Sequence, residues 1–462
     1  MDTRMEHDSL GDVQVPEGAY FGAQTQRAVD NFAVSGMHAH PAFVRATALV
    51  KLASARANRR LGKLDERRAD AIERAAREII DGGMRDQFVV DVFQAGAGTS
   101  HNMNANEVIA NRANEMLGGK RGTYDPVHPN DHVNMSQSTN DTVPASIRVA
   151  TLSMAPDLLA AVTSLADALD AKGGEFDGIL KSARTHLQDA VPIRMGQEFA
   201  GYAWTVRRDA RRIEDATAYL HEINLGGTAA GTGMNTHPQY AMTVAEELSA
   251  VSGLELRPAA NLVSVAASMA DFAHVSSALR TTALDLCQLA NDLRLLSSGP
   301  RTGLAEIRLP ALQPGSSIMP GKVNPVIPEM VDMVCFQVCG NDTTIALATQ
   351  AGQLELNVMM PVIAHNLLQS VEIMTNAARS LDAKCVRGIT ADEARARHYF
   401  ESSVGMATVL NPLIGYEAAA KVAQESARTG ETIVDLVRRQ GRASEEDLQR
   451  LFDPASLTEP RE

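Results

Sequence analysis

The chain has 462 residues, of which 45% are hydrophobic and 21% charged, values typical of a globular protein with a sizeable core. A chain of this length exceeds what one hydrophobic core usually serves, so we expect roughly two to four domains. The 43 basic and 56 acidic side chains give a formal charge of −13, which argues against nucleic acid or an anionic membrane as a partner.

Cysteine usage and hydropathy predict a cytoplasmic protein. Four cysteines are too few for a disulfide scaffold and are interpreted as buried, reduced thiols. Cys335 and Cys339 stand one helical turn apart and could clasp a metal, but no His or second Cys pair lies nearby, so we favour core packing and expect no metal. Inspection finds no apolar run of about 18 residues and no basic, hydrophobic leader, so we expect no membrane segment.

The N-terminal part of the chain ends in a polar stretch. Residues 126–144 are rich in Asn, Asp, Ser and Pro, which predicts a loop and marks the end of a mostly helical domain over residues 1–138. Upstream, Thr99 follows two glycines that would let the backbone approach a ligand closely. Residues 136–141 read SQSTND, which suits a loop lined with hydrogen-bond donors, although a solvated turn would look the same.

Apolar side chains in the middle of the chain repeat with helical spacing. The stripe from Val275 to Leu296 is interrupted only by Thr282. It ends shortly before Gly299-Pro300, a pair that stops a helix. Such stripes need partner helices, so we predict a mainly α fold with a central long-helix bundle over residues 139–387 that self-associates into a larger bundle. Charged residues then predict a small helical domain over residues 388–462. The stripe residues are Val275, Leu279, Leu286, Leu289, Leu293 and Leu296; Leu158, Val162, Leu165 and Leu169; and Val331, Val334 and Val338.

Two shorter polar segments lie within the predicted bundle. Thr185 and His186 pair a hydroxyl with an imidazole, although a lone His is more often structural than catalytic. Residues 226–233 read GGTAAGTG but lack a P-loop ending and a preceding strand, so we interpret them as a turn close to a neighbouring subunit. Nothing in the sequence calls for a nucleotide, flavin or pyridoxal group, and we expect no cofactor.

The most specific stretch is Gly315–Pro325, GSSIMPGKVNP. Its glycines and prolines exclude a continuous helix, while Ser316 and Ser317 supply hydroxyls that can donate or accept a proton. Lys322 and Asn324 add a fixed positive charge and an amide donor, groups that hold a carboxylate. If the next segment, from about residue 328, is helical, its free N–H groups add positive potential. The stretch therefore predicts an anion-binding loop, with an ordinary surface turn as the alternative.

This stretch matches the signature of the fumarase/aspartase superfamily, whose members cleave C–N or C–O bonds to release fumarate. The resemblance runs from about Asp8 to about Phe452 and includes GAGTSHNMNANE at 96–107, HPNDHVNMSQSTND at 128–141 and RTHLQDAVP at 184–192. It implies a three-domain fold, a homotetramer whose active sites combine residues from different chains, and a small dicarboxylate substrate.

The resemblance also implies a role for each polar block. Ser316 would be the general base, and removal of a proton next to a carboxylate creates an aci-carboxylate dianion that preorganised donors must stabilise. Glu329 would raise the basicity of His186 across space. The stabilised carboxylate is assigned to Lys322, Asn324 and Thr185. The other carboxylate is assigned to Thr99, Ser138, Thr139 and Ser317.

Finer local choices indicate the leaving group. Ser100 and Thr139 resemble the members of the superfamily that release ammonia from L-aspartate, and Asn140 and His186 would then contact the amino group. We therefore predict reversible deamination of L-aspartate to fumarate and ammonia, with Ser316 as the base.

Other choices keep alternatives open. Residues 235–238 (NTHP) and 365–370 (HNLLQS) resemble members that hydrate fumarate to malate, and Met360 departs from both groups. Fumarate hydration is therefore the alternative, followed by a lyase for a related amino-dicarboxylate. A structural helical assembly that has lost its activity is a further interpretation. The intact site residues argue against it.

Overall fold

The computed structural model describes residues 2–451 and 453–460, which divide into two compact units. Unit 1 comprises residues 1–159, 211–281 and 336–374, and unit 2 comprises residues 160–210, 282–335 and 375–462. Each boundary between the units falls inside one of five long helices, and none falls at residue 138 or 387. The division into three domains stays a prediction.

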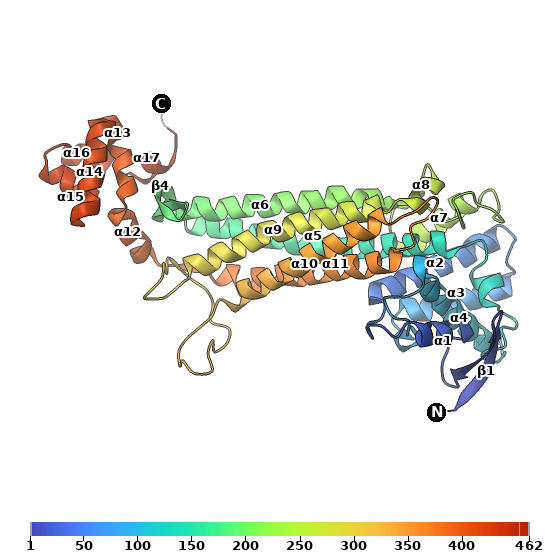
Figure 1. The fold of residues 1–462 in the computed structure, drawn as a ribbon. Helices are drawn as coiled ribbons and strands as arrows, with labels where there is room; N and C mark the ends of the chain where they lie inside the picture. The colour runs from blue at the N-terminus through green and yellow to red at the C-terminus, as the bar shows by residue number, and fades with distance from the viewer. Residues whose placement is uncertain (1, 452, 461–462) are drawn as a thin grey trace. The chain divides into compact units, whose positions relative to one another are not determined.

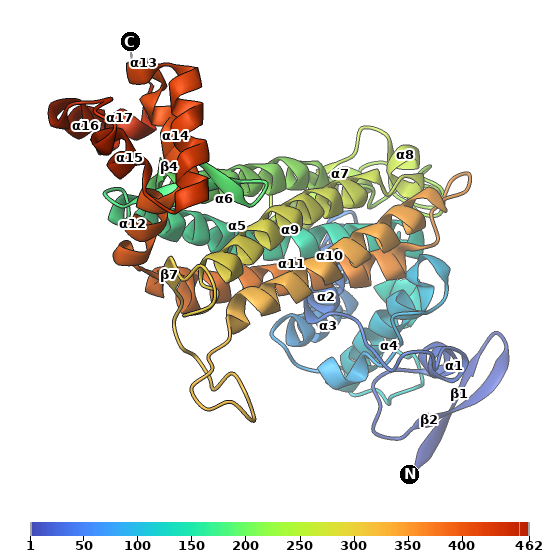
Figure 2. The same cartoon turned by 60° about the vertical axis from the view of Figure 1, so that its left-hand side comes forward.

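Helices dominate the described residues, which confirms the mainly α prediction (Figure 1). The long helices run alongside one another in both views (Figures 1 and 2). They are α5 (Thr139–Glu175), α6 (Met195–Thr217), α9 (Ala270–Leu296), α10 (Val326–Gln350) and α11 (Met360–Lys384). The other helices are α1 (Ala23–Asn31), α2 (Pro41–Arg60), α3 (Glu66–Ile80), α4 (Thr99–Met116), α7 (Tyr240–Ser252), α8 (Leu262–Ala267), α12 (Glu393–Ser402), α13 (Asn411–Ile414), α14 (Tyr416–Thr429), α15 (Ile433–Arg439), α16 (Glu445–Leu451) and α17 (Pro454–Thr458).

Within the described residues, strands form four two-stranded sheets. Antiparallel pairs join β1 (Thr3–Asp8) to β2 (Gly11–Pro16), β3 (Leu180–Thr185) to β4 (Gln188–Arg194), and β7 (Ile307–Arg308) to β8 (Thr390–Ala391). A parallel pair joins β5 (Glu222–Ile223) to β6 (Arg257–Pro258).

The predicted apolar stripes are the buried faces of the long helices. In α9 the whole stripe is buried, including Thr282, and the helix ends at Leu296, shortly before Gly299-Pro300. The stripe of α5 is likewise buried, while in α10 Val334 is only half-buried. Burial of these side chains on folding supplies the main stabilisation of the bundle segments.

Each unit also has a cluster of shorter helices. In unit 1, α2, α3 and α4 share an apolar core that includes Leu52, Ile72 and Ile109. The N-termini of α2 and α3 are fixed locally, since His40 caps α2 and Asp65 caps α3 through their side chains. In unit 2, helices α12 to α17 gather around a core of Phe400, Leu410, Leu436 and other apolar residues, which fits the small helical C-terminal region.

The loop predicted over residues 126–144 is wrong in part. Residues 129–133 form a π-helical turn, and α5 begins at Thr139 and runs through Pro144. Proline has no N–H to bond the carbonyl of residue 140. That carbonyl instead accepts a hydrogen bond from Asn224 Nδ2 at 3.1 Å, so a distant side chain replaces the missing donor.

Two composition-based expectations need adjustment. Among the described residues, α5 is long and apolar enough to cross a membrane by composition, although 56% of its apolar window is buried within the protein. Inspection of the sequence missed this window. None of the four cysteines forms a disulfide, as expected, but only Cys335 and Cys385 are buried, whereas Cys287 and Cys339 are half-buried.

Candidate active site

The first group of predicted residues lies at two helix N-termini in unit 1. Thr99 is the first residue of α4, and Thr139 is the first residue of α5. Asn102, one turn into α4, donates from Nδ2 to Thr139 Oγ1 at 3.2 Å. Gly98 has φ +86°, and a Cβ there would lie 3.1 Å from a methyl group of Val143, so the glycine lets the two helix starts approach. Free N–H groups at helix starts favour a bound carboxylate.

The segment Ser138–Asn140 is held in place by Asp141. Asp141 Oδ1 accepts from Ser138 N at 2.9 Å, and Oδ2 accepts from Gly226 N at 3.0 Å and Thr228 N at 2.9 Å. The Asn140 amide also donates to Ala229 O at 2.7 Å. The segment 226–233 is therefore a turn, as predicted, and it is bound to the start of α5 in the same chain.

Sequence reasoning missed the role of Asp141, although its spacing carried a signal. Ser138 and Asp141 stand three residues apart just before an apolar run, the pattern that marks a helix start. Asp141 is fully buried, and burial raises the pKa of its carboxyl while three backbone N–H bonds and Lys51 oppose that rise.

A buried polar cluster lies behind the same segment. Lys51 of α2 is fully buried, and its Nζ donates to Asn134 Oδ1 at 2.9 Å and to Gln137 Oε1 at 3.0 Å. Asn102 and Asn106 donate to the same Asn134 oxygen at 3.3 and 3.2 Å. Burial lowers the pKa of Lys51 to about 7, with Asp141 opposing the shift.

Sequence reasoning also missed the burial of Lys51. The signal that could have indicated it was a single charged residue inside an apolar run. It follows Leu49 and Val50 and precedes Leu52 in a helix segment that is almost entirely buried. The neighbouring His101 is not a second charge, because burial and then Lys51 lower the pKa of its imidazole to about 3.

The second group lies in unit 2, at the tip of a hairpin. Thr185 is the last residue of β3, and His186 and Leu187 form the turn to β4 with φ of +55° and +59°. Two positive φ values in a two-residue turn match the twist of the flanking strands. Both predicted side chains are exposed at this tip.

The Ser316 loop is confirmed as irregular, with no helix or strand from Leu309 to Pro325. Ser316 Oγ accepts hydrogen bonds from the backbone N–H groups of Ile318 at 3.2 Å and Met319 at 2.9 Å. Hydrogen bonds to an oxygen stabilise its deprotonated form, so they favour Ser316 as a base.

The loop closes on itself at Gly315. Gly315 N donates to Lys322 O at 2.8 Å, and Asn324 Nδ2 donates to Gly315 O at 2.7 Å. A Cβ on Gly315 would lie 2.7 Å from both Asn324 N and Lys322 O, so only glycine fits. Ser317 and Lys322 are exposed, and Lys322 forms no ion pair with any described residue.

The helix expected after the loop begins slightly earlier, at Val326 of α10, and Glu329 lies in its first turn. Within the described residues of unit 2, no hydrogen bond or ion pair joins Glu329 to His186. The amide of Asn324 is engaged by Gly315. The Glu329–His186 pair and the carboxylate contact of Asn324 therefore stay predictions.

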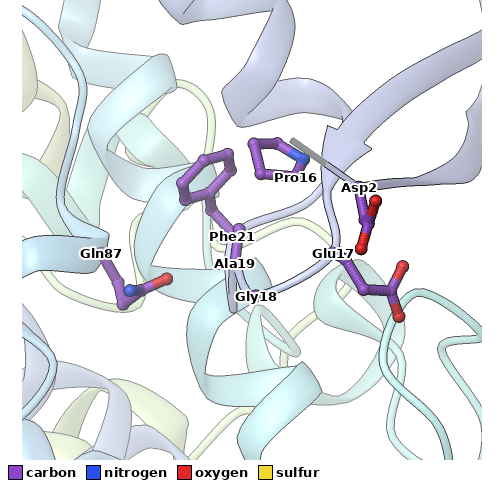
Figure 3. Close-up of a pocket in the computed structure, with 7 residues that line it drawn as sticks. All are labelled: Asp2, Pro16, Glu17, Gly18, Ala19, Phe21 and Gln87. Atoms are coloured by element: carbon purple, nitrogen blue, oxygen red, sulfur yellow. The ribbon is translucent and has the colours of Figure 1, made fainter.

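A surface hollow of about 490 Å³ in unit 1 does not include any predicted site residue. Figure 3 shows the carboxylates of Asp2 and Glu17 next to each other on one rim. The remaining lining residues are Pro16, Gly18, Ala19, Phe21 and Gln87. With two carboxylates and no basic side chain, this hollow repels an anionic substrate.

Comparisons with known proteins agree over the whole chain. Residues 11–340 match a family described as lyase, and residues 406–459 match one described as fumarase C C-terminus. An aspartate ammonia-lyase from a Bacillus species is 49% identical over 459 residues, covering 99% of this chain and 98% of that protein. A class II fumarate hydratase from Bradyrhizobium diazoefficiens is 47% identical, covering 99% of this chain and 97% of that protein.

A solved structure shares the fold. The crystal structure of a fumarate lyase:delta crystallin from Brucella melitensis bound to cobalt has a TM-score of 0.96 and 50% identity, covering 99% of this chain and 100% of that chain. The chain belongs to the fumarase/aspartase superfamily and is an aspartase-type carbon–nitrogen lyase.

Proposed function

We propose that the protein catalyses the reversible deamination of L-aspartate to fumarate and ammonia. The observation that carries the proposal is the Ser316 loop, in which a hydroxyl oxygen accepts two backbone N–H bonds and an exposed lysine stands nearby. The relative that is 49% identical over the whole chain supports the choice of L-aspartate.

Ser316 acts as the general base in this proposal. It removes a proton from the substrate carbon next to one carboxylate, and the electron pair moves into that carboxylate to form the aci-carboxylate. Collapse of this dianion forms the carbon–carbon double bond and expels ammonia. Lys322, Asn324 and Thr185 stabilise the second negative charge, which a protein of formal charge −13 would otherwise oppose.

The second carboxylate binds at the two helix N-termini of unit 1. Thr99, Ser138 and Thr139 offer hydroxyls there, and the exposed Ser317 of the loop adds another. The dipoles and free N–H groups of these two helix starts supply positive potential at the carboxylate, so no cationic side chain needs to contact it. This arrangement favours binding of a small dicarboxylate.

Asn140 and His186 are assigned to the amino group. Since Asn140 Nδ2 already donates to Ala229 O, the acceptor Oδ1 is the part of the amide suited to a substrate ammonium. Glu329 pairs with His186 in this proposal and supports its basicity.

The active form is proposed to be a cytoplasmic homotetramer with shared active sites. Support comes from exposed apolar side chains at helical spacing on α10, namely Met333, Phe336 and Leu347, and from Leu284 on α9. Exposed apolar stripes on long helices are typical of surfaces that pack against partner helices. Assembly would also allow Glu329 and His186 of different chains to meet.

Fumarate hydration to malate is the second candidate. The 47%-identical fumarate hydratase and the segment 235–238 favour it. The two candidates share the base and the carboxylate contacts, so they differ only in the group that leaves.

One assay separates the candidates. Purified wild-type protein should form fumarate, followed by its ultraviolet absorbance, from L-aspartate with release of an equal amount of ammonia, and should convert L-malate far more slowly. The matched Ser316→Ala variant reports any contaminating activity. Conversion of malate but not aspartate by the wild-type protein would overturn the aspartate assignment.

A further inference from the structure

A buried ion cluster in unit 2 involves residues beside both predicted catalytic segments. Glu306 is fully buried, and Arg184 donates to it from Nη1 to Oε2 at 2.8 Å and from Nη2 to Oε1 at 3.1 Å. Lys181 Nζ lies 3.1 Å from Glu306 Oε2 and 2.8 Å from Glu198 Oε2. Two cations and two carboxylates therefore balance, with Glu306 and Lys181 buried and Arg184 and Glu198 partly exposed.

Stability alone gives little reason for such a cluster. Removing charges from water is costly, and apolar residues of similar volume are often equally stabilising. A bidentate Arg–carboxylate pair also has a defined geometry, because two parallel hydrogen bonds join two planar groups. It therefore fixes both the distance and the direction between the segments that carry the two side chains.

Glu306 lies at the root of the Ser316 loop. Its N–H donates to Leu296 O at the end of α9 at 2.9 Å, and its carbonyl accepts from Asp392 N, before α12, at 2.8 Å. The next residues form β7, which pairs with β8, and the irregular loop follows from Leu309. The backbone of Glu306 thus anchors the point from which the loop departs.

Arg184 lies beside the other segment, because it immediately precedes Thr185 and the His186 turn. The pairing of β3 with β4 shifts register between Ser182 and Arg184, which turns this end of the strand. The Arg184 guanidinium also lies 5.4 Å from the Tyr399 ring, whose hydroxyl donates to Gly303 O at 3.3 Å. The hairpin is therefore tied to the root of the loop through its arginine by two routes.

We propose that Arg184 and Glu306 are positioning residues for catalysis, whose bidentate bond fixes the Thr185–His186 turn relative to the root of the Ser316 loop. Neither residue is assigned to the substrate, and the inference rests on the proposed roles of Ser316 and His186. If active sites combine segments from different chains, the two segments fixed by this bond serve different sites of one tetramer.

The test uses Arg184→Lys, which keeps the charge and loses the fork, and Glu306→Gln, which keeps the shape and loses the charge. Each tetrameric variant should lose about tenfold or more in kcat, while inhibition by succinate changes by less than about threefold, because misplaced catalytic groups slow the reaction more than they weaken binding. The double variant should be no slower than the slower single variant, because the Arg184–Glu306 bond is already lost in each single variant. Should Glu306→Gln fail to assemble, Arg184→Lys decides the matter alone.

Arg148→Lys is the matched control. Arg148 is fully buried, donates to Asp271 Oδ2 at 2.7 Å and to Tyr219 O at 3.0 Å, and lies in unit 1. Its variant should lose thermal stability with kcat within about twofold of wild type. A similar kcat loss in this control, or a near-normal kcat in Arg184→Lys, would overturn the proposal. All rates are compared on whichever substrate the wild-type protein converts, so an error in the aspartate assignment leaves this test intact.

Discussion

The two groups of predicted site residues differ in how they are held. At the start of α5, Ser138 and Asn140 are fixed by bonds to Asp141 and Ala229, with buried Lys51 behind them. The Ser316 loop is mostly exposed, and the side-chain hydrogen bonds of Ser316 and Asn324 join residues of the loop to one another. If the proposed roles hold, the carboxylate surface at the start of α5 is preformed, whereas the base lies on a segment that can move without disturbing the helices.

This difference predicts that loop substitutions change catalysis without changing stability, whereas substitutions behind α5 change stability. The largest effect should come from Ser316→Ala. Loss of the base should lower kcat by ~10²-fold or more, the usual scale for general-base catalysis. Its melting temperature and tetramer content, measured by calorimetry and light scattering, should match wild type. Near-normal kcat in an assembled variant would remove Ser316 from the mechanism.

Gly315→Ala tests whether closure of the loop places Ser316. The new Cβ would collide with Asn324 N and Lys322 O, so the loop must open and the base shift. We expect a loss of about 10²-fold in kcat, the scale of a small misplacement of a reacting group. Gly174→Ala in α5 is the control, because a Cβ there meets no atom within 4 Å. An active Gly315→Ala variant would show that this closed conformation is not needed.

Asn140→Ala should act on recognition of the amino group. Loss of the amide should weaken L-aspartate binding by about 1–3 kcal/mol, as for a buried partner left unpaired. Inhibition by succinate, which has no amino group, should change much less. Equal weakening of both compounds would mean that Asn140 only holds the 226–233 turn through Ala229.

A separate prediction concerns folding stability, pH and the buried Lys51. With a folded-state pKa of about 7 against an ordinary 10.5, the folded protein binds fewer protons than the unfolded chain between these values. The contribution of Lys51 to the free energy of unfolding therefore rises with pH between these two values, by up to about 1.4 kcal/mol per pH unit.

Lys51→Met should abolish this rise. Measured by denaturant unfolding, the stability of wild type relative to Lys51→Met should increase from pH 7 to pH 10 and stay level below pH 7. Lys63→Met, at an exposed lysine, should show no such trend. A level difference across the whole range would mean that Lys51 keeps its charge when buried.

Local patterns in the sequence predicted much of the fold. The stripe from Val275 to Leu296 predicted α9 because helical periodicity lies within one segment. Glycine and proline likewise predicted the irregular loop around Ser316. The features that the sequence did not predict depend on side chains far away along the chain. The start of α5 ahead of Pro144 needs Asn224, and burial of Lys51 needs Asn134, each more than 80 positions away along the chain.

The same limit applied to the site. Residue types around Ser316 predicted an anion-binding loop, and the family resemblance implied the roles of the polar blocks. The Arg184–Glu306 bond, by contrast, joins positions 122 residues apart, and no local pattern marks it. The Asp141 contacts to Gly226 and Thr228 are similar, since a glycine-rich turn gives no sign of the carboxylate that will hold it.

The central claim is that the surface at the start of α5 and the Ser316 loop of different chains combine in one active site. The most direct measurement mixes Ser316→Ala protein with a Ser138→Ala/Thr139→Val variant, unfolds and refolds them together, and follows fumarate formation. Neither variant alone should be active. Random co-assembly should restore activity, with about a quarter of the sites carrying both wild-type segments. No recovery in tetramers shown to contain both chains would contradict shared sites and place both segments of each site in one chain.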